Sequence, residues 1–564
     1  MSPHDPNAAV NALADRFWER ILELDPVQAT ILGDDRYDDR LPDLGPDGRA
    51  AEAALSHEVV RDATAINPDT LSAEQLITRD MLLLVAGNSL EALDHKLYQL
   101  AVDHIAGVQT LLIRVAQYQA ADSPERLEKL LARFAAYPTL VDQHIGTLRE
   151  GLGDGRTSAA VPVRRAIEQM ERLLATPAAE APAVAMARVA DDDARDQIRQ
   201  AVLDHQNPAL QKLRDFLAVE YEPRARQEPG IGSLPDGDAA YRLSIRLMTT
   251  VAATAQEVHA FGLEDLDRIE QEKDAIARKL GHRDRVALDA TLADDPSNRT
   301  DDPRALIKLA EDQTARAYAA APRYFGRLPR ADCVVLPVEA YRERETPPAF
   351  YMPPSIDGSR QGQYYLNTYH ASERLLHKLA AITFHEATPG HHFQIGIEQE
   401  LEGLPAFRRL GSRLAGVAYA EGWGLYAERL ADEMSLYASE AERVGMLDTQ
   451  AFRAARLVVD SGLHALGWDR ARAIRYMHDR GALPMVDAEI EVDRYTIWPG
   501  QALAYKIGQR EIERARTDVQ QLMGSRFDVR AFHDEVLAHG SVPLETLRRE
   551  IPGWVESAVA RRPS

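Results

Sequence analysis

The sequence has one cysteine, few aromatic residues and no long hydrophobic run. Cys333 alone cannot form an intrachain disulfide or a zinc site built from several thiolates. Any metal bound here must therefore use histidine and carboxylate side chains. No stretch approaches the roughly 18 apolar residues of a membrane span, and the N-terminus lacks a basic segment followed by an apolar one. We therefore expect a cytoplasmic protein without a membrane partner.

Basic residues are also outnumbered. The chain has 66 Lys and Arg against 88 Asp and Glu, which gives a formal net charge of -22. Proteins that bind nucleic acids neutralise phosphates with Lys and Arg, so this balance argues against a nucleic-acid partner. Hydrophobic residues make up 45% of the chain, which is enough for an ordinary globular core. The oligomeric state is left open by the composition.

Helical periodicity runs through most of the 564 residues. Apolar side chains recur at intervals of three and four, for example from Leu127 to Phe134. The pattern predicts a mainly α protein. Because large helical enzymes often fold as two lobes, we predict an N-terminal helical lobe over 1–300 and a catalytic lobe over 301–564, with one continuous domain as the alternative.

Residues 332–370 have a different pattern. Short runs such as Val334–Leu336 and Gln363–Leu366 are separated by Pro and Gly, as in the strands of a small sheet. This predicted sheet comes directly before a helix that carries His385 and Glu386. Its last strand could form one wall of a cleft and pair with an extended substrate, and a packed hairpin without a ligand is the alternative.

That helix ends in the stretch FHEATPGHH, residues 384–392. Ser372 is a candidate N-cap, and the apolar residues that follow it predict a helix buried on a broad face. The usual HExxH zinc spacing would place a second histidine at position 389, where this chain has proline. The stretch therefore encodes either a lost metal site or a site of another shape.

Pro389 and Gly390 predict that the helix distorts or breaks before the paired histidines. In a regular helix the residue seven positions on lies about 20° round from the first, which would select His392. A local bulge of two residues would instead bring His391 onto the face of His385. We favour His391 as a ligand and keep His392 as its rival.

Hydrolytic zinc usually has three protein ligands and one open position for water. Glu421, in YAEGWGLYAERL, is the candidate third ligand, because an apolar helical turn precedes it and a buried carboxylate needs a charged partner or a metal. Glu386 then becomes the natural general base for the bound water. We expect one zinc ion per chain, held by His385, His391 and Glu421.

Further residues are candidates for support of the same chemistry. Glu428 could orient a ligand histidine, with a surface charge paired to an arginine as the alternative. Asp460 and His464 are four residues apart on a predicted helix, so the carboxylate could orient the imidazole toward an oxyanion. Tyr505, after a Pro-Gly turn, could donate to the same oxygen, and core or capping roles are the alternatives for all three.

Four blocks, FHEATPGHHFQ, YAEGWGLYAERL, RLVVDSGLHALGW and PGQALAYKIG, resemble the bacterial family known as domain of unknown function 885. Members of that family are generally regarded as zinc metallopeptidases. The resemblance implies a mainly α fold related to helical metallopeptidases, with zinc held by His385, a histidine of the Gly-His-His step and Glu421. It also implies a reshaped site rather than a lost one.

Three hypotheses follow for function. The leading one is a zinc-dependent hydrolase that cleaves a short peptide or peptide-like amide. The second is a binding or scaffold protein whose zinc is closed by four ligands, with both His391 and His392 bound. The third is an amide or ester hydrolase of a small-molecule pathway, in which Arg360 or Arg494 binds a substrate carboxylate and Tyr364 lines the site.

Overall fold

The computed structural model describes residues 5–338, 343, 347–354, 360–410 and 413–560. Helices dominate this part of the chain, which confirms the prediction of a mainly α protein. Packing divides the chain into two compact units, each made of three segments. Unit 1 comprises 1–243, 463–470 and 489–499, and unit 2 comprises 244–462, 471–488 and 500–564. Residues 244–300, which we had assigned to the N-terminal lobe, thus group with unit 2.

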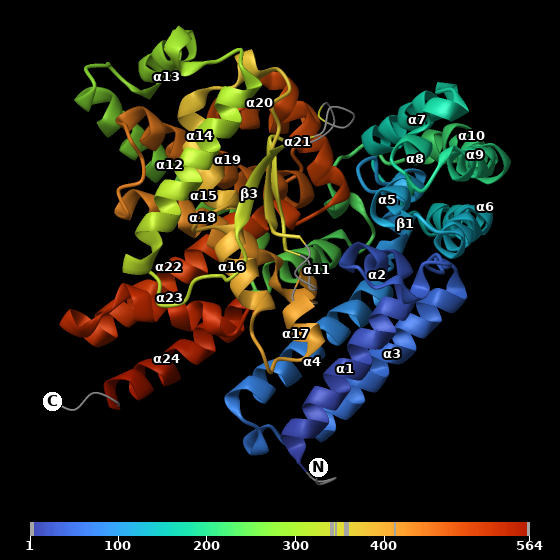
Figure 1. Ribbon diagram of the computed structural model, residues 1–564, viewed down its shortest axis with the longest axis horizontal. Helices are drawn as coiled ribbons and strands as arrows, with labels where there is room; N and C mark the ends of the chain where they lie inside the picture. Colours follow the sequence, from blue (N-terminus) through green and yellow to red (C-terminus); the bar gives the residue numbers. More distant parts are fainter. Residues whose placement is uncertain (1–4, 339–342, 344–346, 355–359, 411–412, 561–564) are drawn as a thin grey trace. The chain divides into compact units, whose positions relative to one another are not determined.

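Unit 1 is built from helices that begin with strong capping signals. The Asp5 and Ser123 side chains cap α1 and α6 by accepting backbone N–H bonds, and a proline follows each cap. The long helices α1, α3 and α4 lie side by side (Figure 1). The helices and strands of this unit are α1 (Pro6–Leu24), α2 (Pro26–Leu32), α3 (Pro46–Ala65), α4 (Ala73–Asp94), α5 (Leu111–Tyr118), β1 (Ala120–Ala121), α6 (Pro124–Asp154), α7 (Ala160–Ala175), α8 (Pro182–Ala185), β2 (Arg188–Val189), α9 (Asp192–Ala201) and α10 (Asn207–Phe216).

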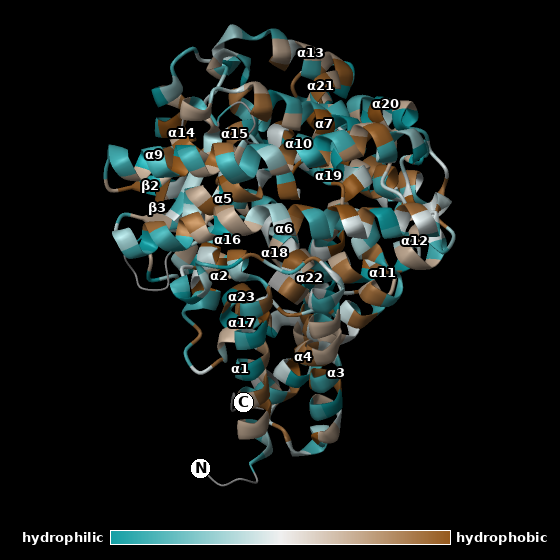
Figure 2. Cartoon of the chain, turned by 90° about the vertical axis from the view of Figure 1, so that its right-hand side faces the viewer, coloured by the Kyte–Doolittle hydropathy of each residue, from teal (hydrophilic) through white to brown (hydrophobic). Residues whose placement is uncertain are grey.

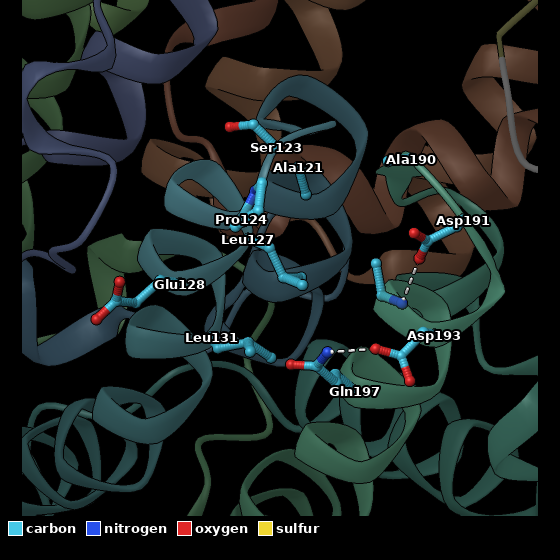
Figure 3. A pocket seen from close by; sticks show the side chains of 11 residues that line it. Ala121, Ser123, Pro124, Leu127, Glu128, Leu131, Ala190, Asp191, Asp193 and Gln197 are labelled. Atoms are coloured by element: carbon cyan, nitrogen blue, oxygen red, sulfur yellow. Dashed lines mark hydrogen bonds between the residues drawn. The ribbon is translucent and has the colours of Figure 1, made fainter.

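Hydrophilic and hydrophobic residues alternate along these helices, as the amphipathic pattern requires (Figure 2). The apolar faces of α5 to α10 form one core that includes Phe134, Tyr137, Leu210 and Phe216. A shallow hollow of about 350 Å³ lies at the surface of unit 1 between α6 and α9. Apolar side chains line it together with three carboxylates, of which those of Asp191 and Asp193 accept hydrogen bonds from residues of α9 (Figure 3). No histidine or cysteine is among its lining residues.

Unit 2 contains the small three-stranded sheet and the helices that pack around it. Its elements are α12 (Ala255–Lys279), α13 (Arg285–Asp294), α14 (Pro303–Ala320), β3 (Cys333–Pro337), β4 (Ala349–Met352), β5 (Gly362–Leu366), α15 (Leu376–Glu386), α16 (His391–Gln399), α17 (Ala406–Leu410), α18 (Arg413–Glu433), α22 (Ala504–Met523), α23 (Val529–Ala538) and α24 (Leu544–Ala560). The helices α11 (Gly237–Thr249), α19 (Glu440–Ala465), α20 (Arg470–Arg480) and α21 (Met485–Ile497) include residues of both units.

The predicted small sheet is present, and its strand order corrects one expectation. The order is β3-β5-β4, with β5 parallel to β3 and antiparallel to β4. The last strand of the region is therefore central, and both of its edges are already hydrogen-bonded. An extended substrate cannot add to β5 as we had expected. The inward side chains Tyr364 and Leu366 of β5 instead pack in one cluster with residues of α14 and α15.

The helix that bears His385 begins later than predicted. Its first residue is Leu376, and Leu375 at the N-cap makes no side-chain cap bond. Ser372 lies in a separate short 3-10 helix, Ala371–Glu373, so the N-cap prediction was wrong. Helix α15 ends at Glu386, which confirms the predicted break before the paired histidines. Among the described residues, no helix has the length and apolar character needed to cross a membrane.

Candidate metal centre

The stretch after α15 breaks the helix completely rather than bulging it. The helix ends at Glu386, and a new helix, α16, begins at His391. The peptide bond between Thr388 and Pro389 is cis. Gly390 approaches the end of α15 so closely that a Cβ atom there would lie 1.9 Å from the backbone oxygen of His385. Glycine is therefore required at this position, and the turn brings the first residue of α16 back toward the last turn of α15.

Three side chains converge as a result. The Nε2 atom of His385 lies 3.7 Å from Oε2 of Glu421, and Nε2 of His391 lies 3.5 Å from the same oxygen. One ligand atom from each of the three residues falls within 4.8 Å of the others. Two atoms bound to one zinc ion at about 2.1 Å and a tetrahedral angle are about 3.4 Å apart. The separations and the donor set thus fit a single zinc-sized ion.

The structure separates the two rival histidines. His392 is 1% exposed, and its Nδ1 atom lies 2.9 Å from the hydroxyl oxygen of Tyr351 on β4. Gly362 of β5 makes room for this ring, because a Cβ atom there would meet His392 Nδ1 at 2.7 Å. Burial lowers the pKa of His392 to about 4, so its ring is neutral. His391 belongs to the converging group, and His392 packs against the sheet.

Glu428 holds His385 in place. Its Oε1 atom lies 2.9 Å from Nδ1 of His385, which directs Nε2 of that ring toward Glu421 and His391. Glu428 is 1% exposed, so it is not a surface charge. Burial lowers the pKa of His385, but Glu421 and Glu428 outweigh burial and raise it to about 9. Burial likewise opposes ionisation of Glu421, yet the two imidazoles hold the pKa of Glu421 well below its usual range.

Each of the three residues that follow Glu421 makes a close packing contact or a hydrogen bond. Gly422 lies at the crossing of α18 and α22, where a Cβ atom would meet backbone carbon of Gly508 at 2.3 Å. The Trp423 indole N–H donates to the carbonyl oxygen of Pro389 at 2.9 Å and ties α18 to the turn. A Cβ atom at position 424 would lie 2.6 to 2.9 Å from three atoms of the His385 ring. Gly424 therefore lets the imidazole lie against α18.

Glu386 is half-buried at the last position of α15, next in sequence to His385. It forms no hydrogen bond or ion pair with another described residue, so its carboxylate is available as a proton acceptor. Its negative charge affects the pKa values of two nearby side chains. It contributes to the raised pKa of His385, and it adds to burial in raising the pKa of Cys333 to about 12. The carboxylate thus lies near the end of α15 and the strand β3.

Tyr505, which was predicted to stabilise an oxyanion, lies beside His385. It is the second residue of α22, and its ring stacks on His385 with 6.5 Å between centroids and 22° between planes. The guanidinium groups of Arg453 and Arg456 lie 5.8 and 4.7 Å from the Tyr505 ring centroid. The Tyr505 hydroxyl has no hydrogen-bond partner among the described residues and is half-buried.

His464 and Asp460 do not act together as predicted. Both ring nitrogens of His464 are already used, because Nδ1 accepts from the backbone N–H of Ile231 and Nε2 lies 3.0 Å from the carbonyl oxygen of Tyr495. Asp460 accepts from the backbone N–H of Gly500. His464 also belongs to unit 1, whereas the converging group belongs to unit 2. Spacing along one helix did not reveal these partners from distant segments.

The predicted substrate-binding residues also have other surroundings. Tyr364 is fully buried, and its hydroxyl lies 3.3 Å from that of Thr383 on α15, so it is a core residue. Arg494 is in unit 1 and faces Glu491 at 3.4 Å. Arg360 is exposed and donates to the carbonyl oxygen of Pro353. None of these contacts joins the three residues to His385, His391 or Glu421.

Two polar residues of α19 were missed from the sequence. Thr449 and Gln450 donate to Oε2 of Glu428 at 2.7 and 2.8 Å. No local pattern marks them, because they lie more than twenty residues from Glu428. The glycines in α18 did carry a signal, since glycine inside a helix costs about 1 kcal/mol and needs a packing reason. Gly424 could therefore have been predicted to face another group closely.

The comparison with protein families decides the classification. The family described as "Bacterial protein of unknown function (DUF885)" matches residues 26–551. The chain belongs to this family. The match covers nearly the whole sequence and includes all four blocks that carried the resemblance.

Two solved structures share the fold. A "putative lipoprotein" from Colwellia psychrerythraea is 23% identical with a TM-score of 0.89, covering 98% of this chain and 100% of that one. A "putative lipoprotein of unknown function" from Shewanella oneidensis is 19% identical with a TM-score of 0.77, covering 96% of this chain and 99% of that one. No curated protein matches the sequence. These likenesses extend the fold over the full chain and assign no activity.

Proposed function

We propose that this DUF885 protein is a zinc-dependent hydrolase that cleaves a peptide or peptide-like amide bond. The observation that carries the proposal is the convergence of His385, His391 and Glu421 within 4.8 Å while His392 is turned to the sheet. Three protein ligands are the number found in hydrolytic zinc sites, where a fourth position stays open for water. Glu386 directly follows His385 in α15, and its charge contributes to the raised pKa of that imidazole.

The roles of the side chains follow from their positions. A zinc ion held by the three ligands would lower the pKa of a water molecule and polarise a carbonyl oxygen. Glu386 accepts the proton of the attacking water and passes it to the leaving amine. The Tyr505 hydroxyl donates to the carbonyl oxygen as negative charge develops there. Glu428 fixes the tautomer of His385, so that Nε2 keeps its lone pair for the metal.

The geometry argues against a structural zinc site. A structural site is closed by four protein ligands, and the scaffold hypothesis needed His392 as the fourth. The ring of His392 packs beside Tyr351 of the sheet instead, and neither it nor any further described His, Cys, Asp or Glu joins the converging group. The third hypothesis, hydrolysis of a small-molecule amide or ester, uses the same site. A short peptide remains our proposed substrate, and a cytoplasmic location remains a prediction.

The test is Glu386→Gln, which keeps the shape of the side chain and removes the base. We expect zinc content equal to that of the parent and at least about a 100-fold loss of turnover on a library of short peptides. Glu402→Gln, an exposed carboxylate that makes no contact with the ligand residues, is the matched control. Undiminished hydrolysis by Glu386→Gln would refute the assigned mechanism. Peptides with free and amidated C-termini in the same library test whether a carboxylate clamp exists.

A further inference from the structure

We infer that Lys506 is a positioning residue for the metal ligand His385, acting through Gln450 and Glu428. This inference rests on the proposed metal centre and says what holds that centre in shape. Lys506 lies on α22, Gln450 on α19, Glu428 on α18 and His385 on α15. All four residues belong to unit 2 and are 3% exposed or less.

Glu428 is the acceptor that links Gln450 to the candidate metal ligand His385. One of its oxygens, Oε1, accepts from His385 Nδ1 at 2.9 Å. The other, Oε2, accepts from the Thr449 hydroxyl at 2.7 Å and from the Gln450 amide nitrogen at 2.8 Å. A buried carboxylate is stable only when its oxygens are satisfied. The orientation of Glu428, and with it that of His385, therefore depends on donors from α19.

Lys506 decides which end of the Gln450 amide faces Glu428. The two ends of an amide have nearly the same shape, but one donates and the other accepts. Lys506 Nζ donates to Gln450 Oε1 at 2.7 Å, and an ammonium group has no acceptor. The carbonyl end must therefore face Lys506, and the NH2 end must face Glu428. If the amide turned over, its oxygen would lie against the Glu428 carboxylate and repel it.

The cost of burying this lysine points to a role beyond packing. Lys506 is 1% exposed and forms an ion pair with Asp265 of α12 at 2.9 Å, and Asp265 also binds Arg268. Replacing a buried ion pair with apolar residues is often neutral for stability. Stability alone thus does not require a lysine here. A donor without an acceptor at this position instead supports the amide orientation of Gln450, whose NH2 end donates to Glu428 and also to the carbonyl oxygen of Leu425 at 3.3 Å.

The candidate ligands depend on the hydrogen-bond path through Glu428, because the imidazole of His391 has no comparable support. The Nδ1 atom of His391 is buried and has no hydrogen-bond partner among the described residues. Of these two imidazoles, only that of His385 has its tautomer fixed by a carboxylate of a described residue. A change that loosens Glu428 would therefore remove the one fixed ligand orientation of the group.

The experiment measures zinc affinity by competition with a chromophoric chelator on metal-free protein to which zinc is returned. We expect Lys506→Met to weaken affinity about tenfold, the low end for outer partners of metal ligands. Gln450→Leu should weaken zinc affinity similarly. The affinity of the double variant should be no lower than that of whichever single variant binds zinc less tightly. Non-additivity of this kind identifies two residues that act through one path.

Lys273→Met is the matched control. Lys273 is also a buried lysine that extends from α12 and pairs with aspartates, Asp289 and Asp448, but it makes no contact with Glu428 or Gln450. It should leave zinc affinity unchanged. Lys506→Met combined with Asp265→Leu removes both charges and keeps the measurement possible if the single variant unfolds. The visible absorption of the cobalt-loaded protein should change in the Lys506 variants and not in the Lys273 variant.

The outcomes separate this inference from the proposed function. Parent affinity in both Lys506 variants would overturn the positioning role and leave the metal centre standing. Equal losses in the Lys506 and Lys273 variants would also overturn it, because they would reflect general destabilisation. A parent protein that takes up no zinc would refute the metal centre itself, and this inference with it.

Discussion

At the scale of single residues, the candidate metal centre depends as much on glycines as on ligands. Gly390 lets the chain turn against the end of α15, and Gly424 leaves room for the ring of His385. The candidate ligands His385 and Glu421 and the candidate base Glu386 were predictable, because they stand in short motifs with known chemistry. The choice of His391 over His392 was also favoured from the sequence. The contact that decides it, between His392 and Tyr351, joins segments 41 residues apart and was not predictable.

Gly424→Ala tests the close contact between α18 and the ring of His385. The added methyl group would lie less than 3.0 Å from the His385 ring, so the ring must move. We expect a loss of stability of about 1–3 kcal/mol, as for overpacking in a core, together with markedly lower zinc content. Chemical denaturation and metal analysis of the same sample measure both quantities.

Gly146→Ala is the control for that substitution. Gly146 lies within α6, and a Cβ atom there would have no neighbour within 4 Å. This change should be neutral or stabilising by about 0.5–1 kcal/mol, because alanine is the better helix former. If Gly424→Ala behaved in the same way, the account of the close contact would be wrong.

At the scale of elements, buried ion pairs connect α19 with α12 and with α15. Asp448 of α19 pairs with Lys273 of α12 and with Lys378 and His377 of α15. Helix patterns in the sequence predicted these elements, since apolar periodicity is a local property. They did not predict which helices meet, or that α18 crosses α22 at Gly422 and Gly508. Such contacts depend on the packing of distant segments, and so did the partners of His464.

Asp448 gives a prediction for pH dependence. Burial raises the pKa of Asp448, but Lys378 and Lys273 outweigh it and hold the pKa far below its usual range. Because the folded-state pKa is lower than the unfolded value of about 3.9, this group stabilises the fold above about pH 4. The contribution is lost as the pH falls below that value.

Asp448→Asn should therefore cost about 3–5 kcal/mol at pH 7, as expected when one partner of a buried ion pair is removed. The difference in unfolding free energy between parent and variant should shrink as the pH is lowered from 5 toward 3, which chemical denaturation can follow. An equal difference at pH 7 and pH 3 would show that the ionised carboxylate is not what stabilises the parent.

At the scale of the whole molecule, the metal should stabilise only the unit that binds it. All three converging ligands belong to unit 2, so zinc bound to the folded chain lowers the free energy of that unit. At a free zinc concentration 100 times the dissociation constant, the gain is about 2.7 kcal/mol. Calorimetry with and without a chelator should show the transition of unit 2 moving to higher temperature with zinc. A shift that persists in Glu421→Ala would place the bound metal elsewhere.

The most direct test of the central claim is metal content per chain, measured by mass spectrometry on parent protein and Glu421→Ala purified without added metal. The account predicts about one zinc per parent chain and a sharp fall in the variant, because the variant keeps only two of the three ligands. Absence of metal from both proteins would contradict it, and would mean that the turn at Pro389 marks a metal site that this chain has lost.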